Sequence, residues 1–425
     1  MPTCCPAFIL PLLSNFRANW RPWLLHFALI GWVTGFWWCR GRWEHELWMQ
    51  WVVLPVFAMN ADRVWALWKE WLGVLGEGGR ENLWWFGLFS LIEWQFWVTG
   101  LRTGDWWGGA GSGKDLILLV ILISSLVLLA RSAQAVALLW RSVVGVAFVA
   151  IAVSAIQFYS HYQVSEERFR LVWRYAPGFN AVTTGILVGF ALVAAIGSVL
   201  EGFRFSKWMR IFVLFFLGGT LAASESRGAL LAVFMAFAVF GVQPFLMVPR
   251  LLWGQVFFSR VVTLLPAVFG YLGYWLLALR VGGSSGELVS RGSAGRLDIY
   301  QAYLADLSVL DWVTGKGSVP SLPAEELGWF VHHPHSAYLG QLVGYGVIGT
   351  ATLIVILLTG LWRIRARPEL SLVVFGLAVC LCDGGLMFSA LSLARWELLV
   401  VLAPLVIGMA RSPQSTIGSS VQPVP

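Results

Sequence analysis

The chain has 425 residues, of which 58% are hydrophobic and 12% are charged, and its mean hydropathy is +0.74. A soluble globular domain needs a larger charged surface than this, so the composition predicts an integral membrane protein. The net charge of +7 at pH 7 fits the excess of basic residues that cytoplasmic loops carry and does not indicate a nucleic-acid partner. We therefore expect membrane lipids around the chain and no nucleic acid bound to it.

The apolar residues are gathered into segments of the length that crosses a bilayer. A transmembrane helix needs about 20 predominantly apolar residues, and by this criterion the chain contains about twelve such segments. They are residues 22–39, 43–59, 83–101, 116–130, 143–158, 181–199, 209–223, 228–248, 261–279, 336–362, 371–389 and 394–410. The predicted fold class is therefore an all-α polytopic integral membrane protein. The first segment follows Arg17 and Arg21 and lacks a small-residue cleavage site, so we expect a signal anchor.

The charges in the loops predict how these segments are oriented. If the N-terminus lies in the cytoplasm, the basic clusters at 204–210 and 363–367 fall on the inner side, as the positive-inside rule requires. Most acidic residues then fall on the outer side. We therefore predict a multi-pass protein with a cytoplasmic N-terminus.

The longest loop between segments faces outward in this topology. Within it, the apolar spacing of residues 296–304 predicts a short amphipathic helix on the membrane surface. Long loops of this kind commonly carry binding or catalytic residues. The chain thus divides into a bundle of about nine spans (1–279), the large outer loop (280–335), three further spans (336–410) and a polar, disordered tail (411–425).

Two arginines near the outer membrane surface are candidates for binding an anionic substrate. Arg227 stands between two adjacent spans, where a charge is costly unless it is paired or faces water. Pairing with Glu225 or contact with the lipid interface are the alternatives for Arg227. Arg296 begins the predicted loop helix, and a contact with lipid headgroups is its alternative role.

Three of the six histidines, His332, His333 and His335, lie within four positions just before the span that begins at Ser336. A histidine can accept a proton from a hydroxyl near neutral pH, which makes this cluster a candidate general base. A solvated loop and a metal site are the alternatives. A metal site would need a fourth ligand and convergent side chains, and neighbouring residues seldom converge, so we predict no metal.

Arginines and a histidine on one side of a membrane fit one type of reaction. Guanidinium groups offer fixed charge and bidentate donors suited to a diphosphate, and the imidazole can activate a hydroxyl nucleophile. Such a set of residues could transfer a sugar from a lipid diphosphate.

A transporter or lipid flippase is the alternative from a different class of protein. Transporters place ionisable residues inside the membrane, and Glu93 and Asp383 are the candidates here. We expect Glu93 to be a buried, paired acid. The sequence shows neither matched halves nor paired interrupted helices, so transport is the less favoured interpretation.

The histidine region resembles the O-antigen ligases and the related O-antigen polymerases of bacterial envelopes. The ligase pattern is His, then Asn, Ser or Gln, nine residues, Gly, two residues, then Gly, Thr or Tyr, and this chain has His335-Ser336, nine residues, Gly346, two residues and Gly349. The step Ser226-Arg227-Gly228, and Gly295-Arg296 before the aromatic Tyr300, are similar to the family as well. The specific resemblance covers roughly residues 180–365.

This resemblance implies a GT-C-like glycosyltransferase that needs no metal or other cofactor and transfers a glycan from undecaprenyl diphosphate with inversion. It places the protein in the bacterial inner membrane, with the active site facing the periplasm. His335 would be the general base, and Arg227 and Arg296 would hold the diphosphate. His332 and His333 are additional to the pattern and either could share the base role, while Tyr300 would anchor the loop helix or stack on a sugar.

The acceptor separates the members of this family. A ligase hands the glycan to a sugar hydroxyl of the lipid A-core, and a polymerase hands it to another lipid-linked repeat. The histidine pattern favours the ligase, with the polymerase as the alternative. Ser336 and the two glycines are expected to shape the entry to the helix, because glycine lets backbones approach closely.

Overall fold

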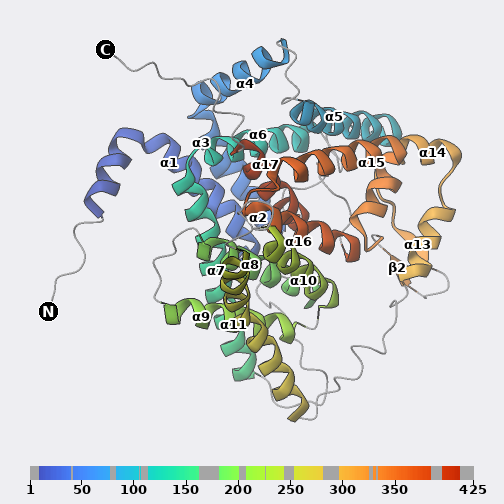
Figure 1. Cartoon of the computed structure of the whole chain (residues 1–425). Helices are drawn as coiled ribbons and strands as arrows, with labels where there is room; N and C mark the ends of the chain where they lie inside the picture. Colours follow the sequence, from blue (N-terminus) through green and yellow to red (C-terminus); the bar gives the residue numbers. More distant parts are fainter. Residues whose placement is uncertain are drawn as a thin grey trace.

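The computed structural model describes residues 9–39, 42–76, 83–104, 106, 113–161, 181–200, 207–224, 226–243, 253–280, 296–324, 329–331, 334–383 and 395–411. These residues form a predominantly helical molecule (Figure 1). The longer helices of the first half are α1 (Ile9–Trp38), α4 (Ala61–Gly76), α5 (Leu83–Thr103), α6 (Gly113–Ala130), α7 (Ala133–His161) and α8 (Ala181–Leu200). Those of the second half are α9 (Lys207–Ala223), α10 (Arg227–Val242), α11 (Trp253–Arg280), α15 (Ala337–Ile364), α16 (Glu369–Cys382) and α17 (Ala403–Ala410). Residues 412–425 of the predicted tail lie outside the described residues.

Several of these helices have the length and composition of membrane spans. Three helices, α6, α7 and α15, are long and apolar enough to cross a membrane, and shorter apolar helices occur in α8 to α11, in α16 and at the end of the chain. Most of the predicted spans fall on a helix or on a run of consecutive helical segments. The segment predicted at 371–389 does not continue as one helix, because α16 ends at Cys382, and residues 244–248 of the segment predicted at 228–248 lie outside the described residues. The helical architecture expected from the composition is therefore confirmed, and the apolar helices are those of a membrane protein.

Two of the predicted spans are interrupted by π-helical turns, which the sequence analysis did not anticipate. The segment at 43–59 consists of α2 (Arg42–Trp48), η1 (Met49–Val53) and α3 (Leu54–Ala58), and the last segment begins with η5 (Leu398–Leu402) before α17. A proline stands in the first turn of the helix that follows each π turn, namely Pro55 and Pro404. Proline has no N–H and its ring clashes with the carbonyl four residues earlier, so a wider turn ahead of it relieves the clash.

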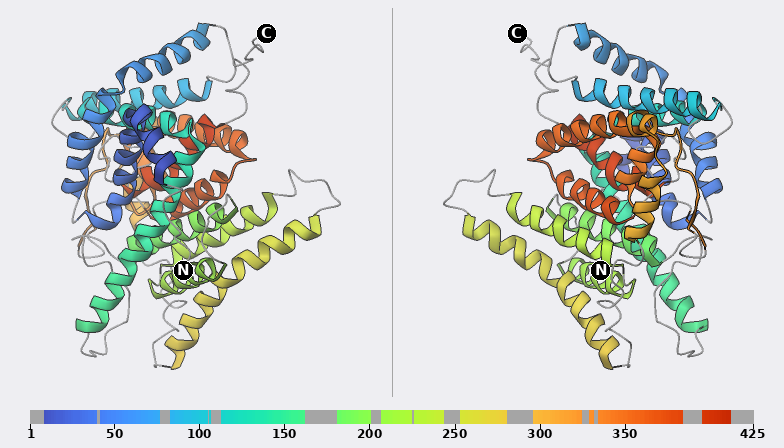
Figure 2. Two further views of the ribbon diagram at one scale, coloured as in Figure 1. Left: turned by 90° about the vertical axis from the view of Figure 1, so that its left-hand side faces the viewer. Right: turned by 90° about the vertical axis from the view of Figure 1, so that its right-hand side faces the viewer.

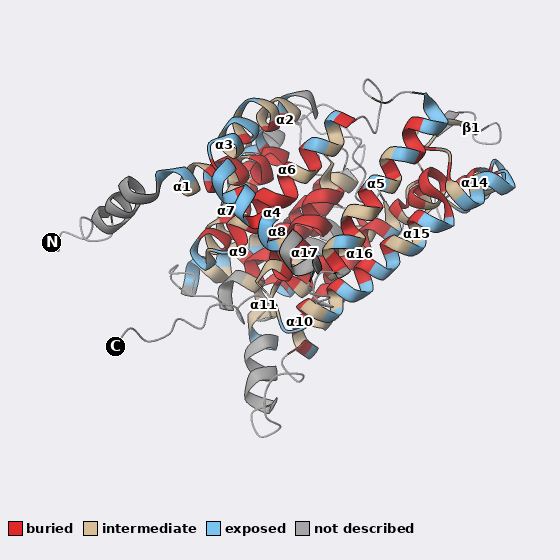
Figure 3. Cartoon of the chain, turned by 90° about the horizontal axis from the view of Figure 1, so that it is seen from above, coloured by how far each residue is buried: buried red, intermediate tan, exposed pale blue. Residues whose placement is uncertain are grey.

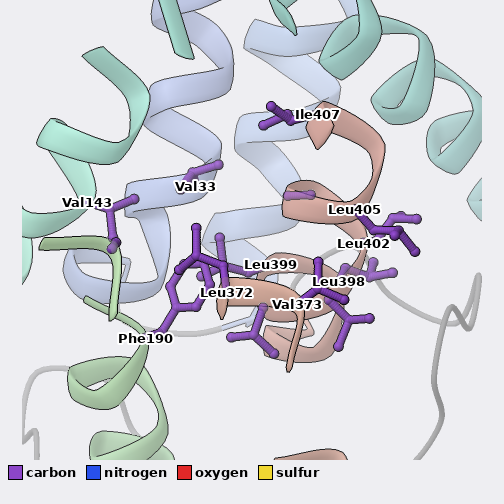
Figure 4. Packing of buried hydrophobic residues seen from close by; sticks show 14 of the residues in the cluster. Val33, Val143, Phe190, Leu372, Val373, Leu398, Leu399, Leu402, Leu405 and Ile407 are labelled. Atoms are coloured by element: carbon purple, nitrogen blue, oxygen red, sulfur yellow. The ribbon is translucent and has the colours of Figure 1, made fainter. Parts of the chain in front are cut away.

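The interior of the bundle is mainly apolar. The middle of α8 and nearly all of α17 are buried around their whole circumference, and their side chains pack with those of α1, α7 and α16. Figure 4 shows this packing around Phe190, Leu372 and Leu399. Peripheral helices instead expose large apolar side chains outward, such as Phe212 on α9 and Leu358 on α15 (Figure 3). Apolar side chains facing both the interior and the surroundings are typical of a helix bundle in lipid.

The pair formed by α9 and α11 packs through small residues. A side chain at Gly218 would overlap the backbone of Ala267, and one at Gly270 would overlap the carbonyl of Phe215. Glycines at these positions let the two helix backbones touch, which is how helices commonly associate in membranes. Figure 2 shows that α11, in yellow, extends away from the rest of the bundle.

The outer loop contains the short helix that the sequence predicts at 296–304, observed as α13 (Arg296–Ala305). A second helix, α14 (Val309–Thr314), follows, and two short antiparallel strands, β1 (Leu322–Ala324) and β2 (Trp329–Val331), pair Leu322 with Val331. The strands are an addition to the all-α fold that we predicted. The loop is tied to α5, because Arg102 forms a salt bridge of 3.2 Å with Asp311 and the Thr99 hydroxyl donates to the Gly317 carbonyl at 2.8 Å.

The loop also docks onto a kink in α15. Gly346 has φ 66° and ψ −171°, a conformation outside the helix that disfavours residues with a side chain. The backbone at Val313 crosses so closely that a side chain at Gly346 would overlap it. Beside this crossing, the backbone N–H groups of Lys316 and Gly317 donate to Val343 and Gly344 at 2.9 and 2.8 Å. Gly346, the first glycine of the pattern described above, is thus a point where the backbone of the loop packs directly against α15.

Replacing Gly346 with alanine is expected to destabilise the folded protein by about 2 kcal/mol, because a positive φ costs a side-chain-bearing residue about 1–2 kcal/mol and the new methyl group meets the backbone of Val313. The melting temperature of the purified protein in detergent measures this effect. The control is Gly145→Ala on α7, where a side chain meets nothing within 4 Å and alanine favours the helix by up to ~1 kcal/mol. Equal melting temperatures for the two variants would contradict this account of Gly346.

Candidate functional site

The candidate site lies at the C-terminal end of α16. The helix ends at Cys382, and Asp383 is its C-cap residue in an extended conformation, with its backbone N–H donating to the Val379 carbonyl at 2.9 Å. The carboxylate of Asp383 therefore leaves the apolar helix at the point where the chain turns. In Figure 1 this end of α16 points toward α13 and the two strands of the outer loop.

His335 contacts Asp383 directly. The Nδ1 atom of the imidazole lies 3.3 Å from Oδ1 of the carboxylate, and both side chains are partly buried, with 32% and 14% of their surfaces exposed. A carboxylate at Nδ1 favours the tautomer in which Nδ1 carries the proton and Nε2 can accept one. The pair therefore has the arrangement of a general base and the acid that orients it.

The backbone of His335 is strained. Its φ of 51° is the only positive φ of a non-glycine residue in the described part of the chain. Such conformations cost about 1–3 kcal/mol and persist only where surrounding contacts hold them, which is common at functional sites.

Helix α13 brings Arg296 and Tyr300 to the same place. The Tyr300 hydroxyl donates to the backbone carbonyl of His335 at 3.4 Å. Arg296 lies close enough to Tyr300 and to the Cys382 thiol for its charge to act on both. Burial raises the pKa of Tyr300 above its usual value, with Arg296 opposing this effect, so the phenol stays protonated at neutral pH and serves as a donor.

Arg227 begins α10, whose first turn packs against the end of α16. Ser226 is the N-cap of this helix and accepts from the Ala229 N–H at 3.5 Å. At Gly228, the residue after Arg227, an added Cβ atom would lie 2.8 Å from the Cβ of Cys382. The turn that carries Arg227 thus lies beside Cys382, the neighbour of Asp383. The N-terminus of α10 adds the positive end of its dipole to the charge of the arginine.

The structure therefore brings His335, Arg296 and Tyr300 together at the end of α16 and places the turn of Arg227 against the same end. Sequence reasoning missed the contact between Asp383 and His335, because we considered Asp383 only as a possible transport residue. Its signal in the sequence was an acid within the apolar segment 371–389, in a chain with a histidine just before the segment 336–362. The distance of 48 residues between the two hid the contact.

The expectation for Glu93 is wrong. We expected a buried, paired acid, whereas the side chain of Glu93 is exposed on α5. The helical period explains the difference, because the buried face of α5 carries Gln95 and Thr99, and residue 93 points to the opposite side from Gln95.

The secondary residues His332 and His333 lie outside the described residues, as does Glu225, the alternative partner of Arg227. The metal site and the Arg227–Glu225 pair therefore stay as sequence predictions. Among the residues that the structure does describe, no group of three or more histidine, cysteine or acidic side chains is arranged around a common point.

The chain matches no model of a known protein family and no curated protein.

Proposed function

We propose that the protein is a membrane-embedded glycosyltransferase with a GT-C-like architecture of about twelve transmembrane helices. Within that class we propose an O-antigen ligase of the bacterial inner membrane, with its site open to the periplasm and its N-terminus in the cytoplasm. The observation that carries the proposal is the contact of 3.3 Å between His335 and Asp383 beside Arg296. This contact places a proton acceptor, His335, near a cationic residue, Arg296, at one end of α16.

The proposed donor is a glycan linked to undecaprenyl diphosphate. Its two phosphates carry negative charge close to the membrane surface, where Arg296 on α13 and Arg227 at the start of α10 would bind them. Guanidinium groups suit this role because each can donate two parallel hydrogen bonds to phosphate oxygens and stays charged at any physiological pH.

In the proposed reaction, the acceptor hydroxyl attacks the anomeric carbon of the donor sugar and gives its proton to Nε2 of His335. The bond from that carbon to the diphosphate oxygen breaks, and undecaprenyl diphosphate leaves with the electron pair. Asp383 stabilises the imidazolium that forms, and the arginines stabilise the charge that develops on the leaving group. Attack from the face opposite the diphosphate inverts the configuration. No metal or cofactor takes part in these steps.

The proposed acceptor is a sugar hydroxyl of the lipid A-core, and a lipid-linked repeat is the alternative acceptor of an O-antigen polymerase. The envelope glycans of a strain that lacks the gene distinguish the two. Loss of long chains from lipopolysaccharide, with lipid-linked polymer accumulating, indicates the ligase. Lipopolysaccharide capped with a single repeat indicates the polymerase, and an unchanged glycan pattern would contradict both.

Replacing Asp383 with asparagine is expected to reduce the turnover number by about 100-fold or more, since the amide keeps the shape of the side chain and removes the charge that orients and stabilises the imidazolium. The rate of glycan transfer by the purified variant measures this effect. Its melting temperature should stay close to that of the wild type, because the substitution is isosteric.

Glu93→Gln is the matched control, because it removes an acidic charge from an exposed position on α5. Glycan transfer by this variant should stay within about two-fold of the wild type, as for most surface substitutions. A transporter would behave differently, with flux of a substrate across the membrane depending on Asp383 and no transfer product formed. Full glycan transfer by Asp383→Asn would rule out the proposed role of the pair.

A further inference from the structure

The start of α15 departs from the usual arrangement of a helix N-terminus. Ser336 is the N-cap residue, a position where serine normally accepts a hydrogen bond from the first turn of the helix. Within the described structure, however, the Ser336 side chain makes no capping hydrogen bond. Next to it, the Tyr300 hydroxyl on α13 donates to the backbone carbonyl of His335 at 3.4 Å. The start of α15 is therefore held by a contact with a different helix.

This bond joins α13 to the backbone of the residue with the positive φ. The peptide group between His335 and Ser336 is thereby tied to α13.

We propose that Tyr300 is a positioning residue that holds His335 in its strained conformation and so keeps the imidazole against Asp383. This inference rests on the proposed function, in which His335 is the base. Positive φ is rarely adopted by a residue with a side chain, so it requires contacts such as this one to hold it. A small rotation of this backbone would swing the imidazole away from the carboxylate.

The same helix carries Arg296 one turn before Tyr300, and the two side chains are close enough for the charge of Arg296 to act on the Tyr300 phenol. A donor diphosphate bound to Arg296 would therefore stabilise the position of the helix that also holds the base. In this arrangement, binding of the donor and presentation of the base depend on the docking of one short element.

Tyr300→Phe tests the proposal, because it removes the hydroxyl and keeps the ring. Loss of a hydrogen bond that acts only through positioning is expected to lower kcat about ten-fold, with KM for the lipid-linked donor unchanged within about two-fold. A residue that contacts the donor would instead raise KM.

Tyr303→Phe is the matched control on the same helix. The Tyr303 hydroxyl also donates to a backbone carbonyl, that of Pro320, at 2.9 Å, and it lies one turn further from Arg296. This substitution should leave kcat within about two-fold of the wild type, because the bond that it removes ends at Pro320 and not at His335, and the buried ring that packs α13 is kept. An equal fall in kcat for both variants would show a general structural effect and overturn the proposal.

Labelling of His335 with diethyl pyrocarbonate gives a second readout that does not depend on catalysis. Fragment-ion mass spectrometry of the modified peptide separates His335 from His332 and His333. The labelling rate at His335 should rise in Tyr300→Phe and stay at the wild-type value in Tyr303→Phe. An unchanged rate in Tyr300→Phe would overturn the positioning role even if the protein proved to have no transferase activity.

Failure of the wild type to transfer glycan under the same conditions would count against the proposed function, and the labelling rates would still decide the positioning role.

Discussion

Replacing His335 with alanine is expected to reduce glycan transfer about 100- to 10,000-fold, which is the range that a positioned general base contributes. The physical reason is the loss of the only described imidazole that contacts Asp383 at this end of α16. A time course of product formation by the purified variant, with donor and acceptor both saturating, measures the effect. Protein insertion is checked by the yield and melting temperature of the variant.

His332→Ala and His333→Ala are the controls for this prediction, because both are histidines of the same short segment. Each should keep most of the wild-type rate if the base is His335. A large loss in either control, with a small loss in His335→Ala, would move the base to a neighbouring position.

Replacing Arg296 with alanine has the second large expected effect. Each hydrogen bond to a charged group is worth about 1.5–3 kcal/mol, so loss of a bidentate contact to the diphosphate should lower kcat/KM by about 100-fold or more. Arg296→Lys should recover only part of this loss, because an ammonium group cannot reproduce two parallel hydrogen bonds. Arg227→Ala and Arg227→Lys should follow the same order if that residue binds the same diphosphate.

Arg102→Ala is the control for the arginine series. Arg102 is also an arginine of the outer side in our topology, yet it bonds Asp311 and Thr314 rather than residues at the end of α16. Its removal changes the net charge equally and should leave kcat/KM within about two-fold, because a partly exposed ion pair contributes little. Equal losses in Arg102→Ala and Arg296→Ala would show a general electrostatic effect and would remove the case for a specific diphosphate site.

The helices could be predicted because their determinants are local. A long run of apolar residues such as 181–199 specifies a helix in a membrane whichever helices pack beside it, because a backbone in lipid must satisfy its own hydrogen bonds. The loop helix at 296–304 was equally readable from the spacing of its apolar residues. The π turns ahead of Pro55 and Pro404 were not predicted, although the two prolines marked the places where the helices could not continue regularly.

The site could be predicted only in part, because its contacts join distant segments. His335, Arg227 and Arg296 could be selected from residue type, position near a span end and the resemblance to a known pattern. The contact with Asp383 depends on how α15 and α16 pack, and the positive φ of His335 is not specified by its residue type. Neither follows from the periodicity of a single segment. Likewise, Gly346 was recognisable as a pattern residue, while its reason, the crossing of the backbone at Val313, is a tertiary contact.

The most direct test of the account uses the purified protein in liposomes, with a fluorescent glycan on undecaprenyl diphosphate, lipid A-core acceptor and a chelator of divalent metals. The account predicts that wild-type protein transfers the glycan to the acceptor with inverted anomeric configuration and releases undecaprenyl diphosphate, and that His335→Ala does neither. Transfer at the wild-type rate by His335→Ala, or retention of configuration in the product, would contradict it.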